Sequence, residues 1–76
     1  MQSLPSPALV DAESRALGLG APAAELHGGL CGWLAGGGAD RAAWPASVLA
    51  DPAAPTPASG STLDQLRDVT VAQLAD

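Results

Sequence analysis

The pattern of apolar positions predicts helices along most of this 76-residue chain. Between residues 22 and 36 the large apolar side chains recur at helical spacing, and a helical wheel places them on one side. These side chains are Leu26, Leu30, Trp33 and Leu34. The opposite side of the wheel carries Glu25, Gly28, Gly32 and Gly36. The segment is therefore predicted to be a helix with a bulky apolar face and a nearly bare glycine face.

The glycines of this helix make it unstable in isolation. Each interior glycine costs about 0.8 to 1 kcal/mol relative to alanine, so neighbours must stabilise the segment. Small residues four positions apart also let a second helix approach closely. We therefore expect the helix at 22–36 to be central and to be covered on both its bulky and its glycine face.

Three further helices are predicted around it. Ser6 and Pro7 form an N-cap followed by proline at the first helical position, and Gly18 is placed to end that helix near Leu17. The short connection to residue 22 predicts an antiparallel hairpin with the central helix. The first helix is expected to turn inward the residues Leu9, Val10, Ala12, Ala16 and Leu17, and to carry an ion pair between Asp11 and Arg15.

The second half of the chain predicts a short helix, a linker and a long helix. The third helix begins either at Asp40 or, because proline disfavours helical geometry before it, at Pro45. Residues 51–60 hold three prolines in six positions and are expected to form an exposed linker. The last helix begins at Ser61 or Thr62, each of which opens a capping box. One face of this helix is lined by Leu63, Leu66, Thr70 and Leu74, with Val69 and Val71 on its flanks.

Composition and charge exclude several classes of function. The formal net charge is −5 and the three cations are scattered arginines, so neither nucleic acid nor an anionic membrane is an expected partner. The only cysteine cannot form an intrachain disulfide, and neither a signal peptide nor a membrane span is recognisable, so a cytoplasmic location is expected. The few bulky side chains argue against a deep small-molecule pocket, and no cofactor is expected.

His27 and Cys31 lie four residues apart on one helix face, a spacing that suits two ligands of one metal ion. A tetrahedral site needs two more ligands, and the sequence has no other His or Cys. Cys31 could also be a nucleophile with His27 as its base, but no third orienting residue or oxyanion donor is evident. We therefore expect no enzyme here, a buried structural Cys31, and a His27 that is hydrogen-bonded to a neighbouring segment.

The segment Ala24-Glu25-Leu26-His27-Gly28, with Leu30-Cys31-Gly32 and the glycines at 36–38, resembles the N-terminal signature of the YgfB/YecA-like family of uncharacterised bacterial proteins. This resemblance implies an all-α fold and a chain that corresponds to the N-terminal half of a larger helical domain. The structural signature comprises Glu25, Leu26, His27, Gly28, Leu30, Cys31, Gly32 and Gly36. The chain departs from the family pattern in two places. Pro22-Ala23 stands where a helix-capping Ser-Pro is usual. Gly29 stands where a bulky apolar residue is usual and Trp33 where a smaller aliphatic one is common, which suggests that the Trp33 side chain fills the space left at Gly29.

Together these features predict one all-α domain over residues 1–76, with about four helices. The resemblance, together with the apolar face of the last helix that the chain leaves uncovered, predicts a non-enzymatic interaction or regulatory module, with a protein partner or self-association. Its candidate interface residues are Trp33, Trp44, Leu66 and Leu74. The two tryptophans are core anchors if they are buried and mark an interface if either is exposed. Two alternatives remain: a truncated structural fragment without independent function, and a metal-binding or thiol-dependent protein.

Overall fold

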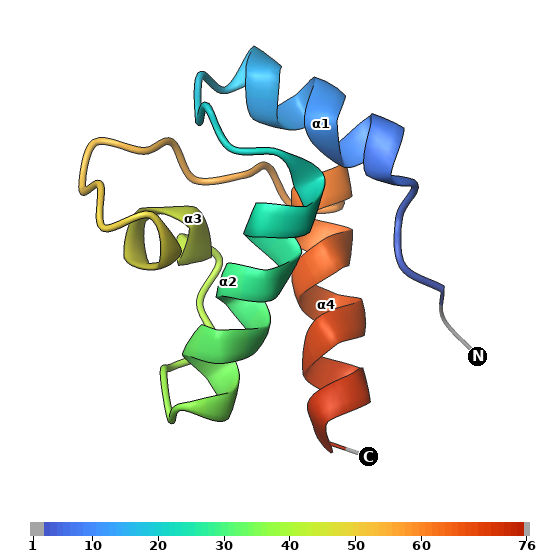
Figure 1. Cartoon of the computed structure of the whole chain (residues 1–76), viewed down its shortest axis with the longest axis vertical. Helices are drawn as coiled ribbons and strands as arrows, with labels where there is room; N and C mark the ends of the chain where they lie inside the picture. The colour runs from blue at the N-terminus through green and yellow to red at the C-terminus, as the bar shows by residue number, and fades with distance from the viewer. Residues whose placement is uncertain (1–2, 76) are drawn as a thin grey trace.

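The computed structural model describes residues 3–75, in which four helices and no strands occur. They are α1 (Pro7–Ala16), α2 (Ala23–Ala35), α3 (Trp44–Val48) and α4 (Thr62–Ala75). Figure 1 shows α2 and α4 running side by side in the same direction, with α1 lying across their N-terminal ends. The all-α prediction is confirmed, but α1 and α2 do not form the expected antiparallel hairpin.

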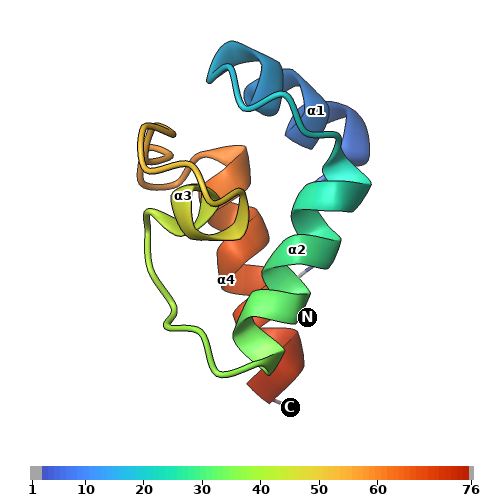
Figure 2. The same ribbon diagram turned by 60° about the vertical axis from the view of Figure 1, so that its left-hand side comes forward.

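The core gathers around the leucine side of α2. Leu26 and Leu30 are fully buried, and α2 packs against each of the other three helices. Figure 2, turned from the first view, shows α1 above α2, with α3 and α4 together on one side of it. The other buried apolar side chains of the core cluster are Val10, Ala21, Trp44, Leu63 and Leu66. The predicted central place of this helix is therefore confirmed.

The glycine side of α2 contradicts the prediction of cover on both faces. Gly28, Gly32 and Gly36 are all exposed, and a Cβ atom added at Gly28 or Gly32 would meet nothing within 4 Å. Helical periodicity groups residues on one side but does not determine whether a neighbour covers that side. The stability of α2 therefore comes from its leucine face, with the bare stripe turned to solvent.

One glycine of α2 does make room for a neighbour. A Cβ atom at Gly29 would lie 2.5 Å from Cγ1 of Val48 in α3, so the missing side chain lets the two helices approach closely. Trp33 instead packs its ring against the backbone of Gly38 and donates a hydrogen bond from Nε1 to the carbonyl of Ala39 at 3.0 Å. The expected compensation between Gly29 and Trp33 is thus wrong, because Val48 takes the space.

Three helices end with the same hydrogen-bonded motif, in which a residue with positive φ follows the last turn. Gly18 (φ 70°) ends α1 as predicted, and Gly37 (φ 95°) ends α2 within the glycine run. At the end of α3 the position is held by Ala50 (φ 53°), which adopts the left-handed region without being glycine. The three closing bonds are Leu19 N–H to Ser14 O at 2.9 Å, Gly38 N–H to Trp33 O at 2.8 Å, and Asp51 N–H to Ala46 O at 2.9 Å.

The inward face of α1 differs from the predicted one. Ser6 caps the helix as expected, with its Oγ accepting from the Ala8 amide at 3.2 Å. Val10 and the polar Ser14 are the buried residues, whereas Leu9 is 58% exposed. Ser14 can be buried because its Oγ donates to the carbonyl of Ala21 at 2.7 Å.

Two carboxylates of α1 cap the helices beneath it. Asp11 Oδ1 accepts from the Ala23 amide at 2.6 Å, and Glu13 accepts from the Leu63 amide. Helix α2 therefore has a side-chain cap after all, supplied by another helix. The predicted ion pair between Asp11 and Arg15 is not formed, because Asp11 is turned to the α2 amide instead.

The remaining connections combine turns with a capping box. A turn at residues 42–43, closed by a hydrogen bond from the Trp44 amide to the Arg41 carbonyl at 3.2 Å, leads into α3, which begins at Trp44. The later of the two predicted starts is therefore nearly correct. Ser61 Oγ accepts from the Asp64 amide at 3.3 Å, which forms one half of the first predicted capping box of α4. The other half differs, because the Asp64 carboxylate accepts from the Gly60 amide at 2.9 Å and not from the Ser61 amide. The linker is less exposed than predicted, because Pro57 within it is buried.

Candidate functional site

The predicted signature residues are divided between the two sides of α2. Leu26 and Leu30 point into the core, whereas Glu25, Gly28, Gly32 and Gly36 lie together on the exposed side. His27 and Cys31 occupy the border between the two sides and are half-buried. The signature therefore combines a packing element with a solvent-facing stripe, which we call the glycine stripe (Glu25, Gly28, Gly32 and Gly36).

A groove of about 350 Å³ opens on the His27 side of α2. Its walls come from the segment before α1 and from α1, α2 and α4, and no Asp, Glu, Lys or Arg lines them. The lining residues are Leu4, Pro5, Ser6, Pro7, Val10, Ala23, Ala24, His27 and Leu66. Sequence reasoning did not find this groove, because its walls come from segments up to about sixty positions apart.

His27 does not make the hydrogen bond that the sequence led us to expect. Its Nε2 atom is buried and has no hydrogen-bond partner. A buried nitrogen without a partner costs about 1 to 3 kcal/mol, so the His27 Nε2 atom does not stabilise the fold by a hydrogen bond to a neighbouring segment. Trp44 Nε1 and Thr70 Oγ1 are likewise buried without a hydrogen-bond partner.

Metal and thiol chemistry would need further ligands or catalytic partners around His27 and Cys31. Within residues 3–75 no three His, Cys, Asp or Glu side chains gather closely enough to hold a metal ion. Cys31 is a free, half-buried thiol on α2. The described part of the chain thus supplies at most two of the ligands that a tetrahedral site requires.

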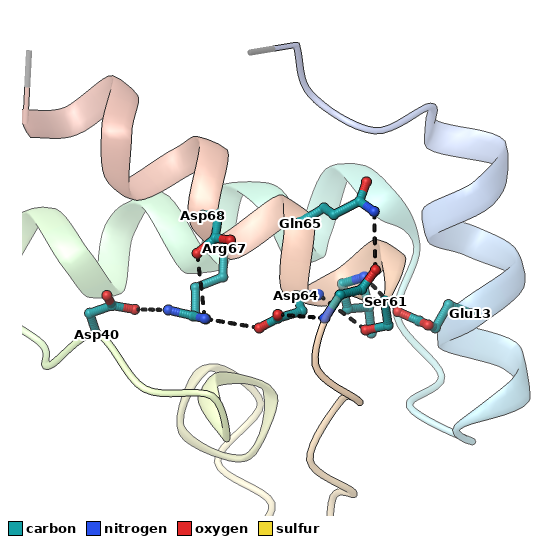
Figure 3. Close-up of polar contacts among 9 residues, drawn as sticks. Glu13, Asp40, Ser61, Asp64, Gln65, Arg67 and Asp68 are labelled. Atoms are coloured by element: carbon teal, nitrogen blue, oxygen red, sulfur yellow. Dashed lines mark hydrogen bonds and ion pairs between the residues drawn. The ribbon is translucent and has the colours of Figure 1, made fainter.

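The strongest charged cluster lies elsewhere, around Arg67 of α4 (Figure 3). The guanidinium contacts Asp64 Oδ1 at 2.9 Å and reaches Asp40 Oδ1 at 2.8 Å, in the loop after α2. Asp68 lies 3.5 Å from it. Because the Arg67 side chain is only 18% exposed, this cluster ties the loop after α2 to α4.

The Arg67 cluster perturbs the pKa values of its members in a consistent direction. The amide of Gly60 and the guanidinium of Arg67 stabilise the Asp64 carboxylate and hold its pKa below the ordinary value. Hydrogen bonds from Arg67 to Asp40 and Asp64 raise the pKa of the guanidinium. The Asp64–Arg67 pair is readable from its i,i+3 spacing, but the Asp40 contact depends on the tertiary fold.

The four candidate interface residues differ in exposure. Trp44 and Leu66 are 1% and 3% exposed, so they are core residues and present no surface to a partner, contrary to the expectation for them. Trp33 is half-buried, and Leu74 is 48% exposed near the end of α4. Sequence reasoning did not identify Leu9 as an exposed apolar residue, because it placed Leu9 on the inward side of α1.

None of the helices within residues 3–75 combines the length and the apolar character that crossing a membrane requires.

These features define a small all-α bundle with a bare helix side, and comparison relates it to an uncharacterised bacterial family. The chain is similar to the UPF0149 protein of Xanthomonas campestris pv. campestris (strain 8004), with 63% identity over 73 residues that cover 96% of this chain and 41% of the relative. The UPF0149 protein of Xanthomonas euvesicatoria pv. vesicatoria is 60% identical over the same shares of the two chains. That of Xylella fastidiosa (strain M23) is 45% identical, with 96% of this chain and 40% of the relative covered.

The chain is therefore a homologue of bacterial UPF0149 proteins over nearly all of its own length. It spans about two fifths of the length of these relatives. No protein-family model matches the chain, and no solved structure matches it.

Proposed function

We propose that this chain is a non-enzymatic protein-interaction module of the YgfB/YecA-like family, and that the glycine stripe of α2 is its contact surface. The observation that carries the proposal is that Gly28 and Gly32 have open space where a side chain would be. Each of these glycines weakens α2 by about 0.8 to 1 kcal/mol relative to alanine. Neither makes room for a neighbouring segment of the described chain. A bare helix backbone lets a partner helix approach closely.

The glycine face was expected to be covered within the chain, and that expectation is wrong. The proposal depends on the opposite finding, that the face is free. The relatives extend well beyond the matched region, so a helix from such a region or from a second molecule is the proposed occupant. Regulation of a partner through this contact, in the cytoplasm, is part of the same proposal.

Replacing Gly32 by leucine tests the proposal without disturbing the fold. A leucine there projects into open space and should preserve the helix, as circular dichroism can verify. Sedimentation equilibrium of the native chain at micromolar concentration should show self-association, and Gly32→Leu should abolish it. The matched control is Ala12→Leu, which adds the same bulk at an exposed position of α1. A native chain that sediments as a monomer, or a Gly32→Leu variant that associates as the native chain does, would contradict self-association.

The partial coverage of the relatives favours a second candidate, a structural unit that works only as part of a longer fold. Mixing the chain with the part of the Xanthomonas campestris relative that the match leaves out separates the two. A complex whose melting temperature exceeds that of the chain, and which Gly32→Leu prevents, would show that the stripe packs within a longer protein. Failure to bind that part, together with self-association of the chain alone, would contradict the structural-unit hypothesis.

A further inference from the structure

We propose that residues 3–17, comprising the N-terminal arm and α1, form a lid that opens as a unit about residues 18–20 while α2, α3 and α4 stay packed. The lid covers the N-terminal ends of α2 and α4 (Figure 1). Its opening would uncover the wall of the groove that α2 and α4 provide. This inference does not depend on the proposed function of the glycine stripe.

The lid is held mainly by polar contacts. Asp11 binds the Ala23 amide, and Glu13 binds the Leu63 amide at the start of α4 (Figure 3). Ser14 donates to the carbonyl of Ala21. All three contacts come from one stretch in the middle of α1 and can be broken together.

The apolar contribution of the lid is small. Val10 is the only fully buried apolar side chain of the lid, Leu17 is half-buried against the core, and Leu9 is 58% exposed. By contrast, α2 and α4 bury Leu26, Leu30 and Leu63 completely. Segments with few buried apolar contacts open locally at a lower free-energy cost than the core does.

The groove lies where a tightly packed lid would have none. Pro5, Pro7 and Val10 line its lid side, while Ala24 and Leu66 line the opposite wall. An open space of about 350 Å³ between these walls means that the N-terminal half of the lid lacks contacts that a filled interface would supply.

The connection after the lid is suited to act as a hinge. Gly18 and Gly20 both have positive φ values, near 70°, and a Cβ atom at either would meet nothing within 4 Å. Glycine reaches more backbone conformations than any other residue, so rotation here strains little. Two such residues separated by one position allow the lid to turn without unwinding α2.

Native-state hydrogen exchange of the 76-residue chain tests the lid. Once it has left the core, a helix of ten residues is too short to stay folded in water, so its amides lose their protection in the open state. The amides of α1 and the capped amides of Ala23 and Leu63 should therefore exchange through a shared opening, at least about tenfold faster than the amides of Leu30 and Val69 after correction for intrinsic rates. Equal protection in α1 and at Leu30 would overturn the proposal. This measurement needs no variant and therefore does not depend on whether a variant folds.

Glu13→Gln sharpens the test, because it removes the charge of one lid contact while keeping the shape of the side chain. Exchange in α1 should become about fivefold faster, a change typical of a lost helix cap, with Leu30 and Val69 unchanged. Asp51→Asn is the matched control, since Asp51 is an exposed carboxylate outside the lid and the glycine stripe and accepts only from the nearby Ala53 amide. Equal acceleration at α1 and Leu30 in Glu13→Gln would show that α1 opens only with the whole fold.

Discussion

The two sides of α2 have similar regularity in sequence and opposite environments in the structure. The leucine side repeats every four residues and is sealed by α1, α3 and α4, whereas the glycine side repeats with the same spacing and faces solvent. Periodic spacing thus identifies a side of a helix, but the residues that lie opposite decide whether that side is buried. Substitutions on the two sides should therefore change stability in opposite directions.

The largest effect is expected on the leucine side. Leu30 is completely buried, so Leu30→Ala should lower the free energy of unfolding by about 2 to 5 kcal/mol through lost burial and a cavity. Urea denaturation followed by tryptophan fluorescence measures this change. A loss below about 1 kcal/mol would mean that α2 is not the centre of the core.

Gly29 is the exception among the helical glycines, and Gly29→Ala should be destabilising. The added Cβ meets Cγ1 of Val48, and overpacking costs about 1 to 3 kcal/mol, which the better helix propensity of alanine offsets by about 1 kcal/mol. The double variant with Val48→Ala should recover part of the loss, as thermal denaturation can show. Stabilisation by Gly29→Ala alone would contradict the close contact of α2 and α3.

Ala50 is the converse case, a position that favours glycine and lacks it. Its left-handed conformation at the end of α3 costs about 1 to 2 kcal/mol, a cost that glycine does not have. Part of this gain is offset, because glycine has a larger conformational entropy in the unfolded state. Ala50→Gly should therefore raise stability by about 0.5 to 1 kcal/mol. A fall in melting temperature would show that Ala50 does not adopt this conformation.

The smallest effect is expected from a substitution in the charged cluster around Arg67 of α4. The pKa of Asp64 is lower in the folded chain than its ordinary value of 3.8, so its stabilising contribution is present above that value. This contribution should be lost as the pH falls from about 3.8 through the folded pKa. Asp64→Asn should lower stability at pH 7 and flatten its acid dependence, measured by urea denaturation at pH 7 and pH 3. An unchanged slope with pH would contradict the hydrogen bonds that Asp64 accepts from the Gly60 amide and from Arg67.

Much of the helix layout could be predicted because its signals are local. Ser6-Pro7 and Gly18 delimit α1, and the capping box at Ser61 starts α4, since each signal acts within a few residues. The leucine side of α2 was equally readable. The caps supplied by Asp11 and Glu13 were not, because their partners lie 12 and 50 positions away.

The candidate site was harder to predict for the same reason. The residues of the glycine stripe were identified, but their exposure depends on where α1, α3 and α4 pack. Trp44 was expected as a core or interface residue, and only the fold decides between the two. The groove beside His27 requires the positions of four separate segments. Local patterns therefore defined elements and faces, while tertiary contacts defined the surfaces.

The stability of Gly32→Ala tests the exposure of the glycine stripe most directly. A methyl group at this position meets no neighbour, so the free energy of unfolding of the isolated chain should rise by about 0.8 to 1 kcal/mol, in urea denaturation at concentrations where the chain is monomeric. A decrease of similar size would show that a segment of the same chain covers the stripe, and would contradict its role as a free contact surface.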